Sequence, residues 1–116
     1  MGNPSARESA LRKVVAAARS IVSYHVGIPV GVQRIRGALV QARPYESIDS
    51  TVFDKYLAEV VGLPLGSERL EWERQALATK DRQLEAANLK WRDPLFDACY
   101  GLIERYGTEI VAPREP

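Results

Sequence analysis

The sequence has a single cysteine, Cys99, and a single histidine, His25, among its 116 residues. One cysteine excludes an internal disulfide and favours a reducing compartment. One histidine excludes a metal site that needs several imidazole ligands from the same chain. No apolar run is long enough to cross a bilayer, and residues 1–6 lack the hydrophobic core of a signal peptide. We therefore expect a cytoplasmic protein with no membrane partner, metal or cofactor.

Motifs of nucleotide and metal enzymes are also lacking. The segment 27–31 has two glycines but no Gly-Lys-Ser/Thr ending, so it does not predict a phosphate-binding loop. Glu68 and Glu71 are three residues apart, but carboxylate metal sites on helices also use Glu-x-x-His pairs, which this chain does not contain. Acidic residues in a first helical turn favour the helix dipole, which accounts for both. The sequence thus predicts no catalytic residue.

Charge is unevenly distributed along the chain, although the net charge is only +1. Residues 1–43 carry seven basic side chains against one acidic side chain, and residues 44–116 carry nine basic against 14 acidic. The two parts should therefore attract each other, within one chain or across a dimer. Hydrophobic content of 46% and charged content of 27% are ordinary for a globular protein. A chain of this size predicts a single domain over residues 1–116, with a flexible tail at 108–116.

The longest stretch without proline or glycine predicts a helix over about residues 68–92, capped by Ser67 and about 37 Å long. Its apolar residues recur at every seventh position and form one narrow stripe: Leu70, Leu77, Leu84 and Trp91. Most of its other residues are charged or carry amides. Because the helix is long for so small a chain, part of it should protrude, bend or meet another chain.

Two helices are predicted before this one in the basic part of the chain. Ser5 and Glu8 form a capping box for a helix over about 5–23. Gly27 can adopt the left-handed conformation that closes it, and Pro29 suits the first turn of a second helix over about 29–42. Gly37 lies inside this second helix, where a close helix crossing would explain it.

The remaining elements are also predicted to be helical. Asp49 or Ser50 can cap a third helix, whose apolar face runs from Val52 to Val61 and which ends at Gly62. Pro94 either opens a fifth helix or kinks one continuous helix, and the sequence leaves both possibilities open. The expected fold is an all-α, single-domain antiparallel bundle of four to five helices with one long helix.

Three candidate sites follow from these patterns. A dyad of His25 and Cys99 is formally possible, or a pocket near His25, Tyr24 and Glu104, but His25 is better explained as interacting with helix C-terminal carbonyls. Cys99 lies at core spacing, which favours an inert thiol. A basic face in the first part of the chain would bind nucleic acid without sequence preference through Arg12, Arg19, Arg34 and Arg36, although no aromatic residues interleave with these arginines.

The third candidate is a protein-binding surface at the turn before the long helix. Trp72 is off the apolar stripe, so it either folds back under Leu63 or Leu65 or is exposed. Exposed aromatic residues beside arginine are typical of protein interfaces, and Leu89 is off the stripe in the same way. The residues of this predicted surface are Leu65, Arg69, Trp72 and Leu89.

The run Leu63-Pro64-Leu65-Gly66-x-x-Arg69-x-x-Trp72, followed by Ala76-Leu77-Ala78-x-Lys80-Asp81 and a closing Cys99-x-x-Leu102-Ile103-x-x-Tyr106, carries a resemblance. It resembles small bacterial all-helical proteins of unknown function over the second half of the chain. The resemblance implies a bacterial source and no activity. We therefore predict a non-enzymatic helical protein that acts by protein–protein interaction and self-associates through the long helix. The alternatives are a small-molecule-binding or enzymatic helical domain, and a nucleic-acid-binding protein.

Overall fold

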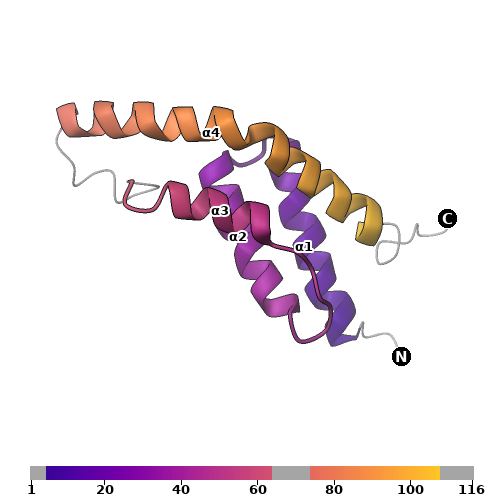
Figure 1. Cartoon of the computed structure of the whole chain (residues 1–116). Coiled ribbons are helices and arrows are strands. Elements are labelled where there is room, and N and C mark those ends of the chain that lie inside the picture. Colours follow the sequence, from indigo (N-terminus) through magenta and orange to yellow (C-terminus); the bar gives the residue numbers. More distant parts are fainter. Residues whose placement is uncertain (1–4, 64–73, 108–116) are drawn as a thin grey trace.

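The computed structural model describes residues 5–63 and 74–107. Every regular element in these ranges is helical (Figure 1). The elements are α1 (Ala6–Val22), α2 (Ile28–Ala42), α3 (Thr51–Glu59), α4 (Arg74–Leu102) and the π-helical turn η2 (Ile103–Gly107). The predicted all-α fold with one long helix is thereby confirmed. None of the described helices combines the length and hydropathy needed to cross a membrane.

The N-terminus of α1 has the predicted capping box. The Glu8 amide donates to Ser5 Oγ at 3.0 Å, and the Ser5 amide donates to Glu8 Oε1 at 3.2 Å. Both bonds satisfy amides that have no partner inside the helix. The buried face of α1 has three- and four-residue spacing and comprises Ala10, Leu11, Val14, Val15, Ala18 and Ile21.

The end of α1 differs from the prediction, because Tyr24 rather than Gly27 adopts the left-handed conformation. Tyr24 has φ 62°, whereas Gly27 has φ −70° and forms the N-cap of α2. The Tyr24 amide donates to the Ile21 carbonyl at 3.1 Å and the His25 amide donates to the Ser20 carbonyl at 3.0 Å. This is the Schellman pattern, in which glycine is the usual left-handed residue. The fold therefore keeps a tyrosine where its backbone conformation is unfavourable.

The close approach of α1 and α2 occurs at Gly31, not at Gly37. A Cβ atom at Gly31 would lie 2.4 Å from Ile21 Cγ1, whereas one at Gly37 would meet nothing within 4 Å. Gly37 is exposed, so the predicted close crossing at this residue is wrong. Gly31 allows α1 and α2 to pack side by side, and they turn back on each other through the short 23–27 connection (Figure 1).

Helix α3 begins where predicted and ends earlier. The Asp49 carboxylate accepts from the Thr51 amide at 2.9 Å and from Thr51 Oγ1 at 2.6 Å, so Asp49 supplies the side-chain cap while Ser50 occupies the N-cap position. Gly62 has φ 88° and lies in the turn after the helix. Val61 was expected on the buried face, but it is 78% exposed because the helix has already ended.

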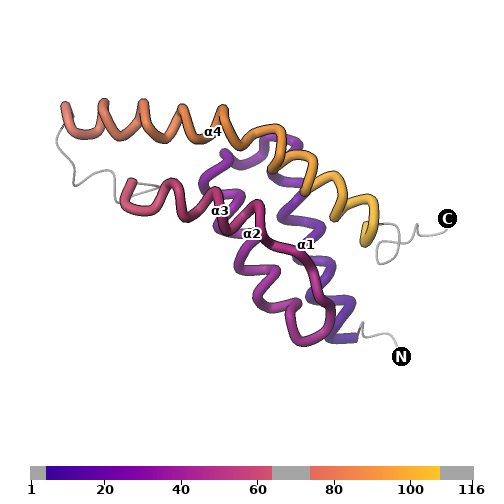
Figure 2. The backbone as a smooth tube through the Cα atoms, in the orientation of Figure 1, coloured from indigo at the N-terminus to yellow at the C-terminus, as the bar shows by residue number. Residues whose placement is uncertain are grey.

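Helix α4 is continuous through Pro94, which settles the alternative that the sequence left open. Its first described residue is Arg74, and residues 68–73 of the predicted helix lie outside the described ranges. Figure 2 shows that the α4 tube changes direction partway along its length. A proline inside a helix removes one hydrogen bond and clashes with the preceding turn, which accounts for such a bend. The predicted tail at 108–116 also lies outside the described ranges.

The core is formed where α4 crosses the α1–α2 pair and packs on α3. In Figure 1, α4 runs across the α1–α2 pair rather than along it. Tyr56 is fully buried and donates its hydroxyl to Asn88 Oδ1 at 2.6 Å. Glu59 accepts from Trp91 Nε1 and from Lys90 Nζ, both at 2.9 Å, which ties α3 to α4.

Within residues 5–63 and 74–107, the predicted attraction between the basic and acidic parts of the chain appears as two ion pairs. Arg7 of α1 lies 2.9 Å from Glu46, and Arg36 of α2 lies 2.9 Å from Asp54 of α3. Glu46 also accepts from the Tyr106 hydroxyl at 2.8 Å. The hydrogen bonds from Arg7 and Tyr106 lower the pKa of Glu46. These contacts join α1, the α2–α3 connection and η2.

Candidate functional site

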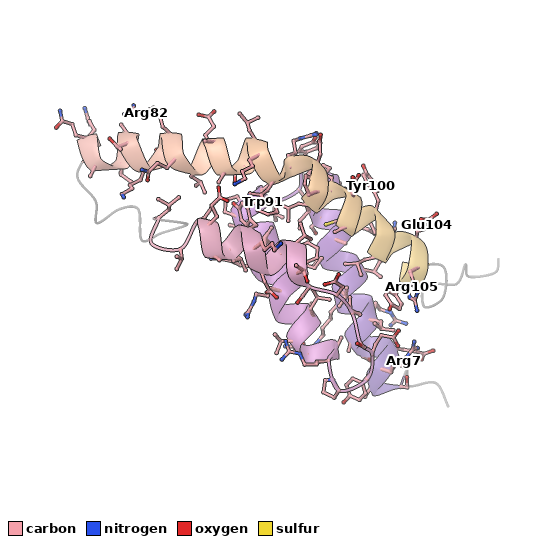
Figure 3. The ribbon with its side chains drawn as sticks, viewed as in Figure 1. Arg7, Arg82, Trp91, Tyr100, Glu104 and Arg105 are labelled. Atoms are coloured by element: carbon pink, nitrogen blue, oxygen red, sulfur yellow. The ribbon has the colours of Figure 1, made fainter. Side chains whose placement is uncertain are left out.

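The side of α4 that faces away from α3 carries the most exposed apolar side chain of the long helix. Leu89 is 73% exposed, and Tyr100 is 53% exposed on the same side. Figure 3 shows Arg82 and Tyr100 on this side and Trp91 on the opposite side, towards α3. We call this surface the outer face; its residues are Arg74, Ala78, Arg82, Glu85, Leu89, Arg92, Asp93, Tyr100 and Glu104. Those within α4 lie within about 60° of Leu89 around the helix axis.

An aromatic cluster joins the outer face to the end of α1. The Tyr24 ring lies 5.6 Å from the Phe96 ring, and the Phe96 ring lies 6.4 Å from the Tyr100 ring. The Arg92 guanidinium lies 4.6 Å from the centre of the Phe96 ring and donates to the Tyr24 hydroxyl. That hydrogen bond raises the pKa of Arg92. Phe96 is buried beneath this group, while Tyr24 remains 66% exposed.

The cluster fixes the position of exposed side chains before any partner arrives. Tyrosine and arginine are enriched among residues that dominate binding energy, and a rigid arrangement reduces the entropy lost on binding. Arg92 is held by a cation–π contact and by a hydrogen bond, so it stays in place on the surface. The outer face therefore offers an apolar centre at Leu89 beside an ordered Tyr24–Arg92 pair.

Charge changes sign along the outer face. Before Leu89 it carries Arg74, Arg82 and Glu85, for a net charge of +1. After Leu89 it carries Arg92, Asp93 and Glu104, for a net charge of −1. An antiparallel copy of the same face would bring the basic end of each copy to the acidic end of the other.

The structure places the predicted interface residues as follows. Leu89 is exposed and lies at the centre of the outer face. Leu65, Arg69 and Trp72 lie outside the described ranges, so the predicted turn surface stays a prediction.

The predicted stripe of the long helix belongs partly to the core. Leu84 and Trp91 are half-buried and pack against the core cluster. Leu77 is half-buried, and Leu70 lies outside the described ranges. Between the described stripe residues, Ala87 is buried. The stripe thus anchors α4 to the rest of the protein, and the outer face lies on the other side of the helix.

The four arginines of the predicted basic face are all exposed, but they face different neighbours. Arg36 is engaged by Asp54 of α3. The Arg19 guanidinium lies close to Gly107 of η2. Arg34 lines a shallow groove between α1 and α2, and Arg12 lies on α1. Nucleic-acid binding by this set stays a prediction.

The candidate catalytic residues are separated by burial. Cys99 is fully buried, and burial raises the pKa of its thiol to about 12. His25 is exposed, and its Nδ1 lies 3.2 Å from Ser23 Oγ. His25 lines a small pocket with Arg19 and Tyr100, but Tyr24 and Glu104 are not among the lining residues. Among residues 5–63 and 74–107, no group of three or more His, Cys, Asp or Glu side chains could hold a metal ion.

The sequence predicted Tyr24 only as part of a pocket with His25 and Glu104, and it did not assign Tyr24, Arg92, Phe96 or Tyr100 to an interface. Three of them follow Leu89 at helical spacing, at positions 92, 96 and 100, so the signal was present in the sequence. The part played by Tyr24 could not be read from the sequence, because it depends on where the end of α1 meets α4.

Comparisons with known proteins give no match to any family model, curated protein or solved structure.

Proposed function

We propose that this protein acts by protein–protein interaction and self-associates through the outer face of α4, without catalysing a reaction. The observation that carries the proposal is the exposure of Leu89, at 73%, at the centre of a face that also holds the ordered Tyr24–Arg92 pair. Leu89 has no part in the core that the described residues form. A second copy would bury it.

The distribution of residues along α4 supports an antiparallel copy with its two-fold axis at Leu89. In that register Arg74 faces Glu104 of the second copy, and Ala78 faces Tyr100 of the second copy. Arg82 lies one turn from Asp93 of the second copy. Glu85 faces Asp93 of the second copy, which sets two like charges opposite one another, so the register depends on the Arg74–Glu104 pairs at the ends of the face and on the packing of Ala78 against Tyr100. An interface of this kind is isologous, as in most homodimers.

The proposal predicts concentration-dependent mass in solution. Light scattering over a dilution series should give a dimer for the wild type and a folded monomer for Leu89→Asp. Burying Leu89 stabilises the dimer by roughly 1–2 kcal/mol per subunit. Because the substitution removes this contribution from both subunits, the dimer Kd should rise by roughly 30- to 700-fold.

Val61→Asp is the matched control, because Val61 is 78% exposed and lies after α3, away from the outer face. It should leave the dimer Kd unchanged. The proposal would be contradicted if the wild type were monomeric at all concentrations, or if Leu89→Asp and Val61→Asp changed the dimer Kd equally.

Charge reversal tests the register separately from hydrophobic contact. Arg74→Glu alone and Glu104→Arg alone should each weaken the dimer, because each places like charges opposite one another. The double variant should restore most of the affinity, because it rebuilds the pair with exchanged signs. Additive losses in the double variant would exclude this antiparallel register.

A further inference from the structure

A second surface, independent of the outer face, is a groove between α3 and the second half of α4. Its volume is about 720 Å³, and it is open to solvent. One wall is formed by the α2–α3 connection and the first turns of α3, and the other by α4 from Trp91 to Leu102. The lining on the α4 side includes Pro94, Ala98 and Gly101, and a Cβ atom at Gly101 would meet nothing within 4 Å.

The inside of the groove is apolar. Phe53 and Leu102 are buried at its base, and Ile48, Val52 and Trp91 are half-buried in its walls. The polar atom of Trp91 is already used, because Nε1 donates to Glu59. An occupant of this part must therefore present apolar side chains.

Two positive charges at the rim can meet an occupant. Lys55 is exposed and makes no ion pair in the part of the chain that the structure describes. Arg105 stacks on the Tyr106 ring at 5.3 Å, and its guanidinium lies 4.0 Å from Glu46, at the outer limit of an ion pair.

The nearby carboxylates are already engaged. Glu46 accepts from Arg7 and Tyr106, and Asp49 accepts twice from Thr51. These hydrogen bonds lower the pKa of both carboxyl groups, so both are ionised at neutral pH. Arg7 neutralises the charge of Glu46, whereas Asp49 keeps its negative charge because its partner, Thr51, is neutral. The lining residues Lys55, Arg105 and Asp49 therefore give the groove a net charge of +1, which favours an acidic occupant over a basic one.

The shape of the groove favours a helix as its occupant. An open groove of this size does not enclose a small molecule, which needs most of its surface buried. The described residues form no β-strand, so an extended peptide would find no strand edge to pair with. An amphipathic helix needs only an apolar groove for its side chains at positions i, i+3 or i+4, and i+7.

We propose that this groove binds one amphipathic helix of a partner protein, whose apolar side chains enter between α3 and α4 and whose acidic residues meet Lys55 and Arg105. This binding does not depend on the outer face. The protein would then bind a different protein in addition to a second copy of itself.

Two labelled synthetic helices of about 18 residues, roughly five turns, test the proposal by fluorescence anisotropy against the full chain. They share one apolar face and differ in their flanks, which are glutamate in one and lysine in the other. The glutamate-flanked helix should bind saturably and the lysine-flanked helix should not. Lys55→Glu combined with Arg105→Glu should reverse this preference.

Gly101→Leu fills the groove and should weaken binding roughly tenfold or more. Gly37→Leu is the matched control, because Gly37 is also an open helical position but lies on α2, and it should bind as the wild type does. Leu89→Asp should also bind normally, which separates this proposal from self-association. Circular dichroism checks that each variant is folded.

Three results would overturn the proposal. They are absence of saturable binding by the glutamate-flanked helix, equal binding of both helices, and equal effects of the two leucine substitutions. A fourth result would assign the groove to a small anionic amphiphile instead. In that case a long-chain fatty acid would bind without displacing either helix, and Gly101→Leu would abolish its binding.

Discussion

Two alanine substitutions in α2 should change stability in opposite directions. Gly31 and Gly37 lie in the same helix, and alanine gains about 0.8–1.0 kcal/mol over glycine from helix propensity at both positions. They differ in what the new methyl group meets. At Gly37 it meets nothing within 4 Å, and at Gly31 it lies 2.4 Å from Ile21 Cγ1 and 3.1 Å from Val26 Cγ2.

The contact at Gly31 cannot be relieved cheaply. Ile21 is 1% exposed and β-branched, so its side chain has few alternative rotamers. Ordinary carbon–carbon contacts are about 3.5–4.0 Å, so α1 and α2 must separate by roughly 1 Å. Overpacking of this kind costs about 1–3 kcal/mol, and the upper half of that range applies to so short a contact. After the propensity gain, Gly31→Ala should destabilise by about 1–2 kcal/mol, and Gly37→Ala should stabilise by about 0.4–1 kcal/mol.

Urea unfolding followed by circular dichroism measures both effects. With a slope of about 1–3 kcal/mol per molar urea, the two midpoints should shift in opposite directions by roughly half a molar each. The experiment is best done in the Leu89→Asp background, because self-association makes apparent stability depend on concentration. If Gly31→Ala stabilised the protein as much as Gly37→Ala does, the close packing of α1 on α2 at Gly31 would be wrong.

Three further predictions concern pH, a buried hydrogen bond and the thiol. Hydrogen bonds from Arg7, and to a lesser extent from Tyr106, lower the pKa of Glu46 in the folded state. The Glu46 carboxylate therefore contributes to stability above its ordinary pKa near 4, and this contribution is lost as the pH falls through the lowered pKa of the folded state. The urea concentration at the unfolding midpoint should therefore be constant from neutral pH to about pH 5 and should decrease when the pH is below about 4. The decrease should be smaller in Glu46→Gln. Tyr56→Phe leaves the Asn88 oxygen without its donor and should cost about 0.5–1.5 kcal/mol by the same urea assay. Cys99 should react with a thiol reagent only in denaturant, because it is fully buried, and rapid labelling of the folded protein would contradict that burial.

Local patterns in the sequence predicted the elements well, because capping and periodicity act over a few residues. The Ser5 and Glu8 capping box is present, and α2 begins one residue before the predicted start. Gly31 could also have been identified, since it shares a helix face with Ile35, Ala38 and Ala42, whereas Gly37 does not.

Other features could not be predicted from the sequence, because they depend on contacts between segments that are far apart in the chain. The left-handed Tyr24 is held where α1 meets Arg92 and Phe96 of α4, and a sequence rule assigns that conformation to glycine instead. Whether Pro94 opens or bends a helix depends on packing on both sides of it, because Asp93 can equally cap a new helix. Of the candidate interface, only Leu89 was identified in advance, by its position off the apolar stripe.

Disulfide trapping at the two-fold axis tests the central claim, self-association through the outer face, most directly. Helices packed with axes about 8–10 Å apart, and with Cα atoms at a radius of about 2.3 Å, bring facing Cα atoms to roughly 3–5 Å. That separation overlaps the range of about 4.4–6.8 Å that a disulfide spans. In a Cys99→Ala background, Leu89→Cys should therefore form a covalent dimer under mild oxidation, and Val61→Cys should not. Absence of the dimer at position 89, or equal dimer formation at both positions, would contradict self-association through this face.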